Sequence, residues 1–209
     1  MIITIFGATG MVGKELVKQA LFKNHLVKAF GRNVFTAGFT ENKNLQLVQG
    51  ALFDDRQVLD AIKGSDAVLS ALGGDIGGTD KTRSLGMKHI VAQMKKAAVN
   101  RIVAIGGKGC LTGNDDKLIM DAPGFPPEYL PVSYEHLKAY EYLEESGLSW
   151  TFVCPPDIMN EGPTGIFKTA AGQMPAGGND TINAGDLALF MLKEIEKNDF
   201  VQSRVGISN

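Results

Sequence analysis

The stretch IITIFGATGMVG, residues 2–13, decides the fold of this chain. Ile2, Ile3, Ile5 and Phe6 form a short apolar run that is typical of a buried parallel strand, and the glycine loop GATGMVG follows at once. An amphipathic stretch, 14–22, comes next. A strand, a glycine loop and a helix in this order are the usual opening of a Rossmann-type α/β fold that binds a dinucleotide. The sequence therefore predicts a doubly wound parallel sheet.

The three glycines of this loop have the GxxGxxG spacing, and each has its own expected role. Gly7 allows the tight turn, Gly10 lets the backbone approach a pyrophosphate, and Gly13 lets the helix pack closely on the strand. The helix that follows presents free N–H groups and a partial positive charge to the phosphates. We therefore expect the loop and the first helical residues to bind the cofactor.

Composition limits what the protein can be. The 209 residues suit one domain spanning residues 1–209, and a net charge of −2 favours neither nucleic acid nor an anionic membrane as a partner. Two cysteines, Cys110 and Cys154, are too few for a disulfide framework and suit a reducing compartment. The first strand starts at residue 2, which leaves no room for a signal peptide. We expect a cytoplasmic protein without a metal site.

Apolar runs alternate with amphipathic stretches to the end of the chain, as in a parallel sheet with crossover helices. The predicted strands are 2–6, 26–30, 45–49, 67–71, 101–105, 149–154 and 203–207. The predicted helices are 11–22, 55–63, 81–97, 134–146 and 185–197.

Two segments interrupt the alternation: 111–131 is rich in Asp, Gly and Pro, and 155–181 is rich in Pro and Gly. Both follow strands at the edge where such folds bind ligands, so we expect a substrate wall in the first and a lid in the second. Glycines also cluster after two strands, in 73–78 and in 106–109. Turn chemistry explains one such cluster; two at the same edge favour backbone lying against a long ligand.

The end of the second predicted strand indicates which nucleotide is bound. A site for NAD usually has Asp or Glu there, which hydrogen-bonds the ribose 2′-hydroxyl. In this chain the strand runs into Gly31 and Arg32, and the next acid is Glu41. An arginine can form two parallel hydrogen bonds with a 2′-phosphate, although it can also be an ordinary surface residue. We expect NADP(H) to be preferred over NAD(H).

The chain resembles the atypical short-chain dehydrogenase/reductase families. It is similar to small NAD(P)H-binding proteins that include biliverdin-IXβ reductase/flavin reductase and bacterial NADH-flavin reductases. The resemblance covers nearly the whole chain. It rests on these segments: IFGATGMVG (5–13), Arg32, GALFD (50–54), GSDAVLSALGG (64–74), MKKAAVNRIVAIGG (94–107), LEESGLSWTFVCPPDI (143–158) and INAGDLALFML (182–192).

The resemblance implies a Rossmann fold, an NAD(P)H cofactor and a set of cofactor contacts. The residues that it assigns to the cofactor are Gly7, Thr9, Gly10, Met11, Val12, Arg32, Leu52, Leu72 and Gly73. It also implies that 155–181 borders the substrate pocket. We add Gly13, Gly106 and Gly107 from the glycine patterns.

The family's catalytic side chains do not all carry over. Biliverdin-IXβ reductases have a serine just past the fifth strand, where this chain has Gly106 and Gly107. They have a histidine after the Pro-Pro dipeptide, where this chain has Asp157. These departures argue against biliverdin as the substrate and do not affect cofactor binding.

Residues 134–138, YEHLK, match the YxxxK pair of short-chain dehydrogenases, in which the ammonium lowers the pKa of the phenol. The register argues against Tyr134 and Lys138 as that pair. Relatives place the ribose-binding lysine about ten residues before the serine that here is Ser146, which corresponds to His136. Two residues along a helix are about 200° apart, so His136 and Lys138 face opposite ways. The candidates for catalysis are His136, Asp157, Tyr134 and Lys138.

Two classes of function remain open. The first is an NADPH-dependent reductase that passes hydride to a flat small-molecule acceptor, such as a flavin or a quinone. Such a reaction requires the protein to position the cofactor and the acceptor more than to supply a dedicated acid. The second is a non-catalytic NADP-binding regulator that senses the redox state of the cofactor. A sugar-nucleotide epimerase or dehydratase is disfavoured because few residues follow the sixth strand. We expect a monomer or a small homo-oligomer.

Overall fold

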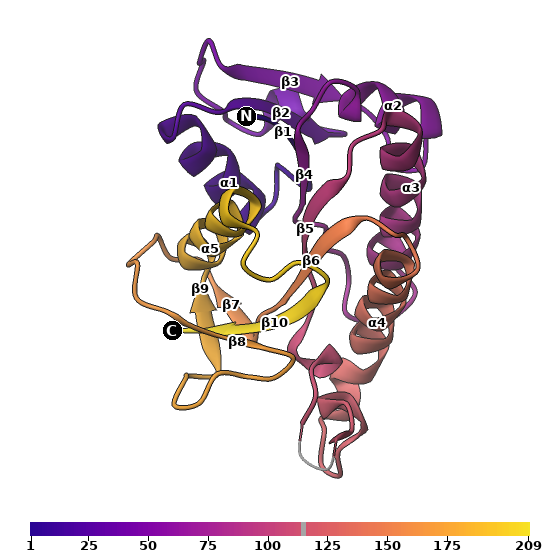
Figure 1. Ribbon diagram of the computed structural model, residues 1–209, viewed down its shortest axis with the longest axis vertical. Helices are drawn as coiled ribbons and strands as arrows, with labels where there is room; N and C mark the ends of the chain where they lie inside the picture. Colours follow the sequence, from indigo (N-terminus) through magenta and orange to yellow (C-terminus); the bar gives the residue numbers. More distant parts are fainter. Residues whose placement is uncertain (114–115) are drawn as a thin grey trace.

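A central sheet of eight strands separates two layers of helices in the computed structural model, which describes residues 1–113 and 116–209 (Figure 1). Its strands are β1 (Ile2–Phe6), β2 (Leu26–Gly31), β3 (Leu45–Gln49), β4 (Ala67–Ser70), β5 (Arg101–Ile105), β6 (Ser149–Cys154), β8 (Lys168–Ala171) and β10 (Ser203–Ser208). The strand order is β3-β2-β1-β4-β5-β6-β10-β8. All neighbouring strands are parallel except β8, which is antiparallel to β10. This confirms the predicted doubly wound α/β fold.

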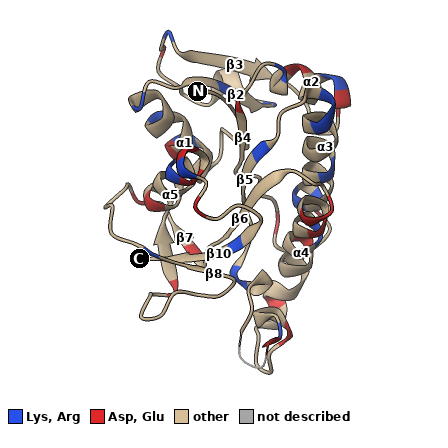
Figure 2. Ribbon diagram, in the orientation of Figure 1, with Lys and Arg blue, Asp and Glu red and all other residues tan. Residues whose placement is uncertain are grey.

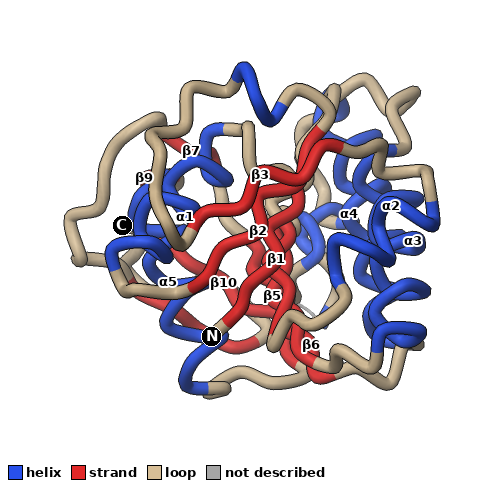
Figure 3. The backbone as a smooth tube through the Cα atoms, turned by 90° about the horizontal axis from the view of Figure 1, so that it is seen from above, coloured by secondary structure: helices blue, strands red, loops and turns tan. Residues whose placement is uncertain are grey.

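Helices cover both faces of the sheet (Figure 3). One face carries α1 (Met11–Phe22) and α5 (Ala184–Lys197), and the other carries α2 (Asp55–Ile62), α3 (Thr82–Ala97) and α4 (Leu130–Glu144). The side chains of β1 alternate between the two faces. Ile3 and Ile5 belong to the core under α1 and α5, whereas Phe6 belongs to the core under α2 to α4. The strand is buried on both sides, which explains why all its residues but Thr4 are apolar; the Thr4 hydroxyl is hydrogen-bonded to Ala61 and Ser65.

The structure reproduces the seven predicted strands to within one residue at each end. The largest difference in a helix is at α4, which begins at Leu130 and not at the predicted residue 134. Pro131 lies in its first turn, where a missing N–H costs nothing, so the proline does not delay the helix.

The segment 155–181 contains strands that the sequence did not reveal. Besides β8, it carries β7 (Asp157–Met159) and the start of β9 (Thr181–Asn183), which pair in parallel as a small second sheet. These strands have three or four residues each, too few for a periodic pattern to show.

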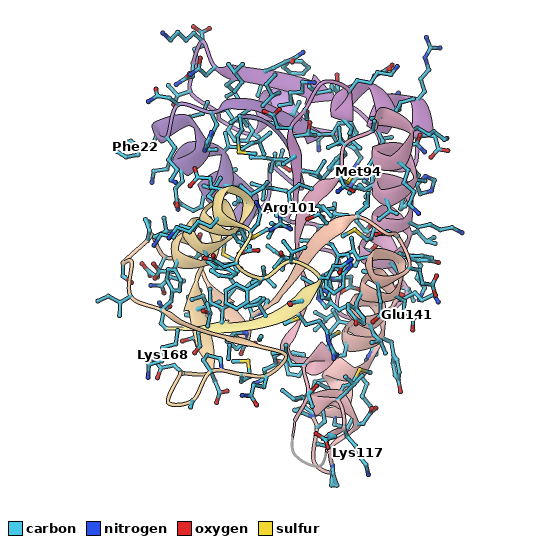
Figure 4. The ribbon with its side chains drawn as sticks, in the orientation of Figure 1. Phe22, Met94, Arg101, Lys117, Glu141 and Lys168 are labelled. Carbon is cyan, nitrogen blue, oxygen red and sulfur yellow. The ribbon has the colours of Figure 1, made fainter. Side chains whose placement is uncertain are left out.

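The crossover from β2 to β3 carries only the short 3₁₀ helix η1 (Val34–Thr36) where the other crossovers carry α-helices. A groove of about 640 Å³ lies between this crossover and α1. Phe22 lies at the outer end of α1, and its side chain is 88% exposed (Figure 4).

Charged residues of both signs are mixed along the helices, with no broad face of one sign in this view (Figure 2). Among the described residues, no helix combines the length and the apolar character that crossing a bilayer requires.

Candidate functional site: the carboxyl edge of the sheet

The parallel strands β1, β4, β5 and β6 end at the same edge of the sheet. The glycine loop 7–13 follows β1, the loop 71–81 follows β4, and the glycines 106–109 follow β5. The three glycine-rich segments that the sequence singled out are therefore neighbours in space.

The backbone of the glycine loop leaves no room for side chains at two positions. Gly7 has a φ of +73°, and a Cβ there would lie 2.2 Å from the carbonyl oxygen of Ala71. A Cβ at Gly13 would lie 2.0 Å from the carbonyl oxygen of Gly7. The loop is closed by a hydrogen bond of 3.0 Å from the Gly10 N–H to the Gly7 oxygen. Both glycines are therefore required by the fold itself.

Gly10 differs from the other two glycines, because a Cβ there would meet only the Gly7 oxygen, at 3.4 Å. It is the N-cap residue of α1, no side chain caps the helix, and no acidic residue lies in the first turn. The N–H groups of Met11, Val12 and Gly13 have no carbonyl within the helix to bond, so they are free to bind an anion. These residues fit the pyrophosphate of a dinucleotide.

The end of β2 lies beside the glycine loop. A Cβ at Gly31 would be 3.3 Å from Cγ2 of Thr9, so the two segments touch. The next residue, Arg32, is exposed, and its carbonyl oxygen accepts a hydrogen bond of 2.9 Å from Nε2 of Gln49. No ion pair involves its guanidinium within the described residues. The arginine therefore remains available for a phosphate near Thr9.

Leu52 and Leu72 meet over α3. A Cβ at Gly86 would overlap Leu52 at 2.5 Å and Leu72 at 2.9 Å. Gly73, next along the chain, has open space where its Cβ would be. The two leucines thus form an apolar wall beside a backbone that a ligand can approach.

The loop after β4 is held in place by residues that sequence analysis missed. Arg83 donates from Nη1 to the Asp75 oxygen and from Nη2 to the Gly74 oxygen, each at 2.9 Å. Asp80 accepts from the backbone N–H groups of Asp75, at 3.1 Å, and of Thr82, at 2.8 Å. The only available signal was a run of charged residues directly after a glycine-rich loop.

A second missed residue, Glu135, joins α4 to the start of α3. Its buried carboxylate accepts from Nζ of Lys81 at 2.8 Å and from Oγ of Ser84 at 2.5 Å. Burial alone would raise the pKa of Glu135, but these two hydrogen bonds outweigh burial and lower it. Glu135 therefore joins α3 and α4 close to the loop that follows β4.

The two glycines after β5 have different surroundings. A Cβ at Gly106 would lie 2.3 Å from the ring of Phe152, so core packing alone explains this glycine. A Cβ at Gly107 would lie 2.9 Å from Cδ2 and 3.4 Å from Nε2 of His136. The glycine therefore allows the imidazole edge to lie directly against the backbone at the end of β5.

His136 is an uncharged imidazole in this position. Burial, with a smaller contribution from the charge of Arg83, lowers the pKa of His136 to about 3. Its Nδ1 is buried and has no hydrogen-bond partner in the described part of the chain. The ring can therefore take part in hydrogen bonding near neutral pH, but it carries no charge.

Tyr134 and Lys138 lie elsewhere on α4. The side chain of Tyr134 is 57% exposed. Lys138 is exposed, pairs with Glu141 at 2.5 Å and lies over the ring of Tyr142. The structure therefore brings His136, and not Lys138, to the end of β5, as the register argument predicts. A catalytic dyad of Tyr134 and Lys138 stays a prediction to be tested.

Asp157 is exposed at the start of β7. Its backbone N–H donates to the Asp180 oxygen at 3.3 Å, and Lys108 binds the carboxylate of Asp180 at 3.2 Å. Lys108 also donates from its backbone N–H to the Pro155 oxygen at 3.0 Å. These contacts tie the segment 155–181 to the residues that follow β5.

No group of three His, Cys, Asp or Glu side chains that could hold a metal ion occurs in 1–113 or 116–209. Both cysteines, Cys110 and Cys154, are buried, and burial raises the pKa of each thiol. Thiolate chemistry is therefore not expected of either residue.

Comparison with known proteins agrees with this geometry. The model of the NAD(P)H-binding family matches residues 7–198. The uncharacterized protein YwnB of Bacillus subtilis is 28% identical over 214 residues, which cover 99% of this chain and 98% of that protein.

Solved structures share the whole fold. A Streptococcus pneumoniae protein described as a "putative NADH-flavin reductase" is 25% identical with a TM-score of 0.84, covering 100% of this chain and 99% of that one. A Burkholderia pseudomallei protein described as a "putative exported protein" is 33% identical with a TM-score of 0.85, and both chains are covered completely.

Proposed function

Because the chain belongs to the NAD(P)H-binding family, we propose that it is a reductase that uses NADPH to reduce a flat small-molecule acceptor, such as a flavin or a quinone. The observation that carries the proposal is the start of α1 at Gly10, which no side chain caps and where a Cβ would meet only the Gly7 oxygen, at 3.4 Å. The similarity to a protein described as a "putative NADH-flavin reductase" supports the choice of acceptor.

In this proposal the main task of the protein is to bind and orient the cofactor and the acceptor. The N–H groups at the start of α1 hold the pyrophosphate, and Arg32 binds the 2′-phosphate that distinguishes NADPH from NADH. Gly73 and Gly107 let the backbone lie close to the cofactor. Bound NADPH supplies the hydride. His136 offers an uncharged hydrogen-bonding edge beside Gly107, and solvent supplies the proton that the acceptor takes up.

The second candidate function is a non-catalytic NADP-binding regulator. The exposure of Tyr134 and the pairing of Lys138 with Glu141 are consistent with it, because neither side chain supplies an acid at the end of β5. A flavin reductase does not need such an acid, so the same observation is compatible with both functions.

One experiment separates the two functions. NADPH oxidation is followed by absorbance with a panel of flavins, quinones and tetrapyrroles, and the Gly10→Val variant serves as the control for the site. The reductase predicts turnover with a flavin or a quinone that is lost in the variant. Tight NADPH binding without turnover on any acceptor contradicts the reductase and supports the regulator.

A further inference from the structure

Arg83 lies in the first turn of α3, and its side chain turns back over the loop 73–78. Its two terminal nitrogens donate to consecutive carbonyl oxygens, those of Gly74 and Asp75, both at 2.9 Å. A Cβ at Gly74 would lie 3.1 Å from Nη1. The guanidinium therefore acts as a two-pronged donor that fixes the direction of two peptide groups.

Partial burial of the charged Arg83 guanidinium costs solvation free energy. The guanidinium is about half buried, burial lowers its pKa, and Nε is buried without a hydrogen-bond partner in the described residues. No carboxylate of the described part of the chain lies within ion-pair distance of Arg83. The carboxylates of Asp80, Glu135 and Asp75 favour the charge of Arg83 without pairing with it, so its direct hydrogen bonds are those to the loop.

The loop is also confined from the other side. Gly78 has a φ of +80°, and a Cβ there would lie 2.5 Å from Cβ of Pro131, at the start of α4. The segment 73–78 is therefore enclosed between the first turns of α3 and α4. Gly73, at its beginning, remains open.

We propose that Arg83 is a positioning residue for the cofactor site, because its two hydrogen bonds hold the loop 73–78 in the conformation that leaves Gly73 open. The part that concerns NADPH rests on the proposed function. The part that concerns the loop does not.

The test compares Arg83→Met, which removes the donors and the charge, with Arg83→Lys, which keeps the charge and loses the two-pronged geometry. Arg56→Met is the matched control, because that side chain is 91% exposed on α2. Amide hydrogen exchange in the protein without cofactor reports on the loop, through the N–H groups of Asp75 and Ile76 that are hydrogen-bonded now. Titration of NADPH into the same variants reports on the cofactor site.

We expect at least tenfold faster exchange confined to 73–78 in both Arg83 variants, and at least tenfold weaker NADPH binding. Because Arg83→Lys keeps the charge and still loses the loop, the effect is assigned to the two-pronged hydrogen bonding. An arginine that only stabilised the fold in general would instead speed exchange across the whole sheet. The control should change none of these quantities.

Unchanged exchange in the loop, or faster exchange spread evenly over the sheet, overturns the proposal. So does normal loop exchange in Arg83→Lys, because the charge alone would then suffice. If the unmutated protein fails to bind NADPH, the proposed function is wrong, and loop exchange still decides the role of Arg83.

Discussion

The glycine loop 7–13 and the segment 155–183 both border the carboxyl edge of the sheet, but different forces hold them. In the glycine loop, backbone lies against backbone: Gly7 contacts Ala71, and Gly13 contacts Gly7. In the second region, side chains from distant positions hold short strands. Close backbone contacts require glycine, so the first region is evident in the sequence as a glycine pattern. Hydrogen bonds between side chains that are far apart in the sequence leave no such pattern, so the second region is not.

Asp186 is the centre of the second region. Its carboxylate is fully buried in the first turn of α5 and accepts from the Thr164 N–H and hydroxyl, at 2.8 Å each, and from the Gly165 N–H at 2.7 Å. It also accepts from Nδ2 of Asn209 at 2.8 Å. The Asp186 side chain therefore holds two segments against α5. One is the connection between β7 and β8, and the other is Asn209, the residue after β10. These hydrogen bonds fix residues 164–165 of the expected lid against α5. A lid role for the segment 155–181 stays a prediction.

Gly13→Val gives the largest expected effect on stability. The new side chain would have to displace the backbone of residues 7 and 8, so the free energy of unfolding should fall by at least about 4 kcal/mol. Urea denaturation measures the loss. Gly10→Ala is the control and should stay within about 1 kcal/mol of the unmutated protein. Similar losses for both variants would show that the loop does not have the backbone contacts described.

Asp186→Asn tests the second region. The variant replaces a charged acceptor of several hydrogen bonds with a neutral amide, so the free energy of unfolding should fall by about 3 kcal/mol. Urea denaturation measures this loss, and amide hydrogen exchange should change mainly in 161–166. The exposed Glu41→Gln serves as the control. Burial would raise the pKa of Asp186, but its hydrogen bonds outweigh burial and lower it.

This shift predicts a pH dependence. Because the pKa is lower in the folded than in the unfolded protein, the stabilisation is present above about pH 4 and is lost as the pH falls through the folded value. The variant should lose less stability than the unmutated protein between about pH 5 and pH 2. Equal acid sensitivity of the two proteins would show that Asp186 is not the group that titrates.

Most of the fold was predictable from the sequence, because the inner strands of a sheet covered on both faces are mostly apolar. The three glycine-rich segments at the carboxyl edge were evident as well, because they follow strand ends. Glu135 was not, since Lys81 and Ser84 become its neighbours only when α3 and α4 pack together. The bonds of Arg83 depend on the path of the loop 73–78, which has no periodic pattern. The strands β7, β8 and β9 are short and are held by Asp186 and by pairing, which leaves no periodic signal.

Arg32→Ala should weaken the binding of NADPH by about tenfold to a hundredfold and leave NADH nearly unaffected, because a charge-assisted pair with the 2′-phosphate is lost. Isothermal titration with both nucleotides measures the difference. Arg56→Ala is the control for a general loss of positive charge. Equal affinity of the unmutated protein for NADPH and NADH would rule out this role for Arg32.

Tyr134→Phe should have the smallest effect, with turnover within a few-fold of normal, because the hydroxyl is exposed and solvent can supply the proton. A general acid contributes about 10²–10⁴-fold, so a dyad with Lys138 would be evident in steady-state rates. A hundredfold decrease would restore that dyad and refute the register argument.

The central claim is that the start of α1, at its N-cap residue Gly10, binds the pyrophosphate of NADPH. Calorimetric titration of NADPH into the unmutated protein and into Gly10→Val tests it most directly, with circular dichroism to show that both are folded. We predict that the unmutated protein binds and that the folded variant binds at least a hundredfold more weakly. Binding by the variant within a few-fold of normal, or no binding by the unmutated protein, would contradict the claim.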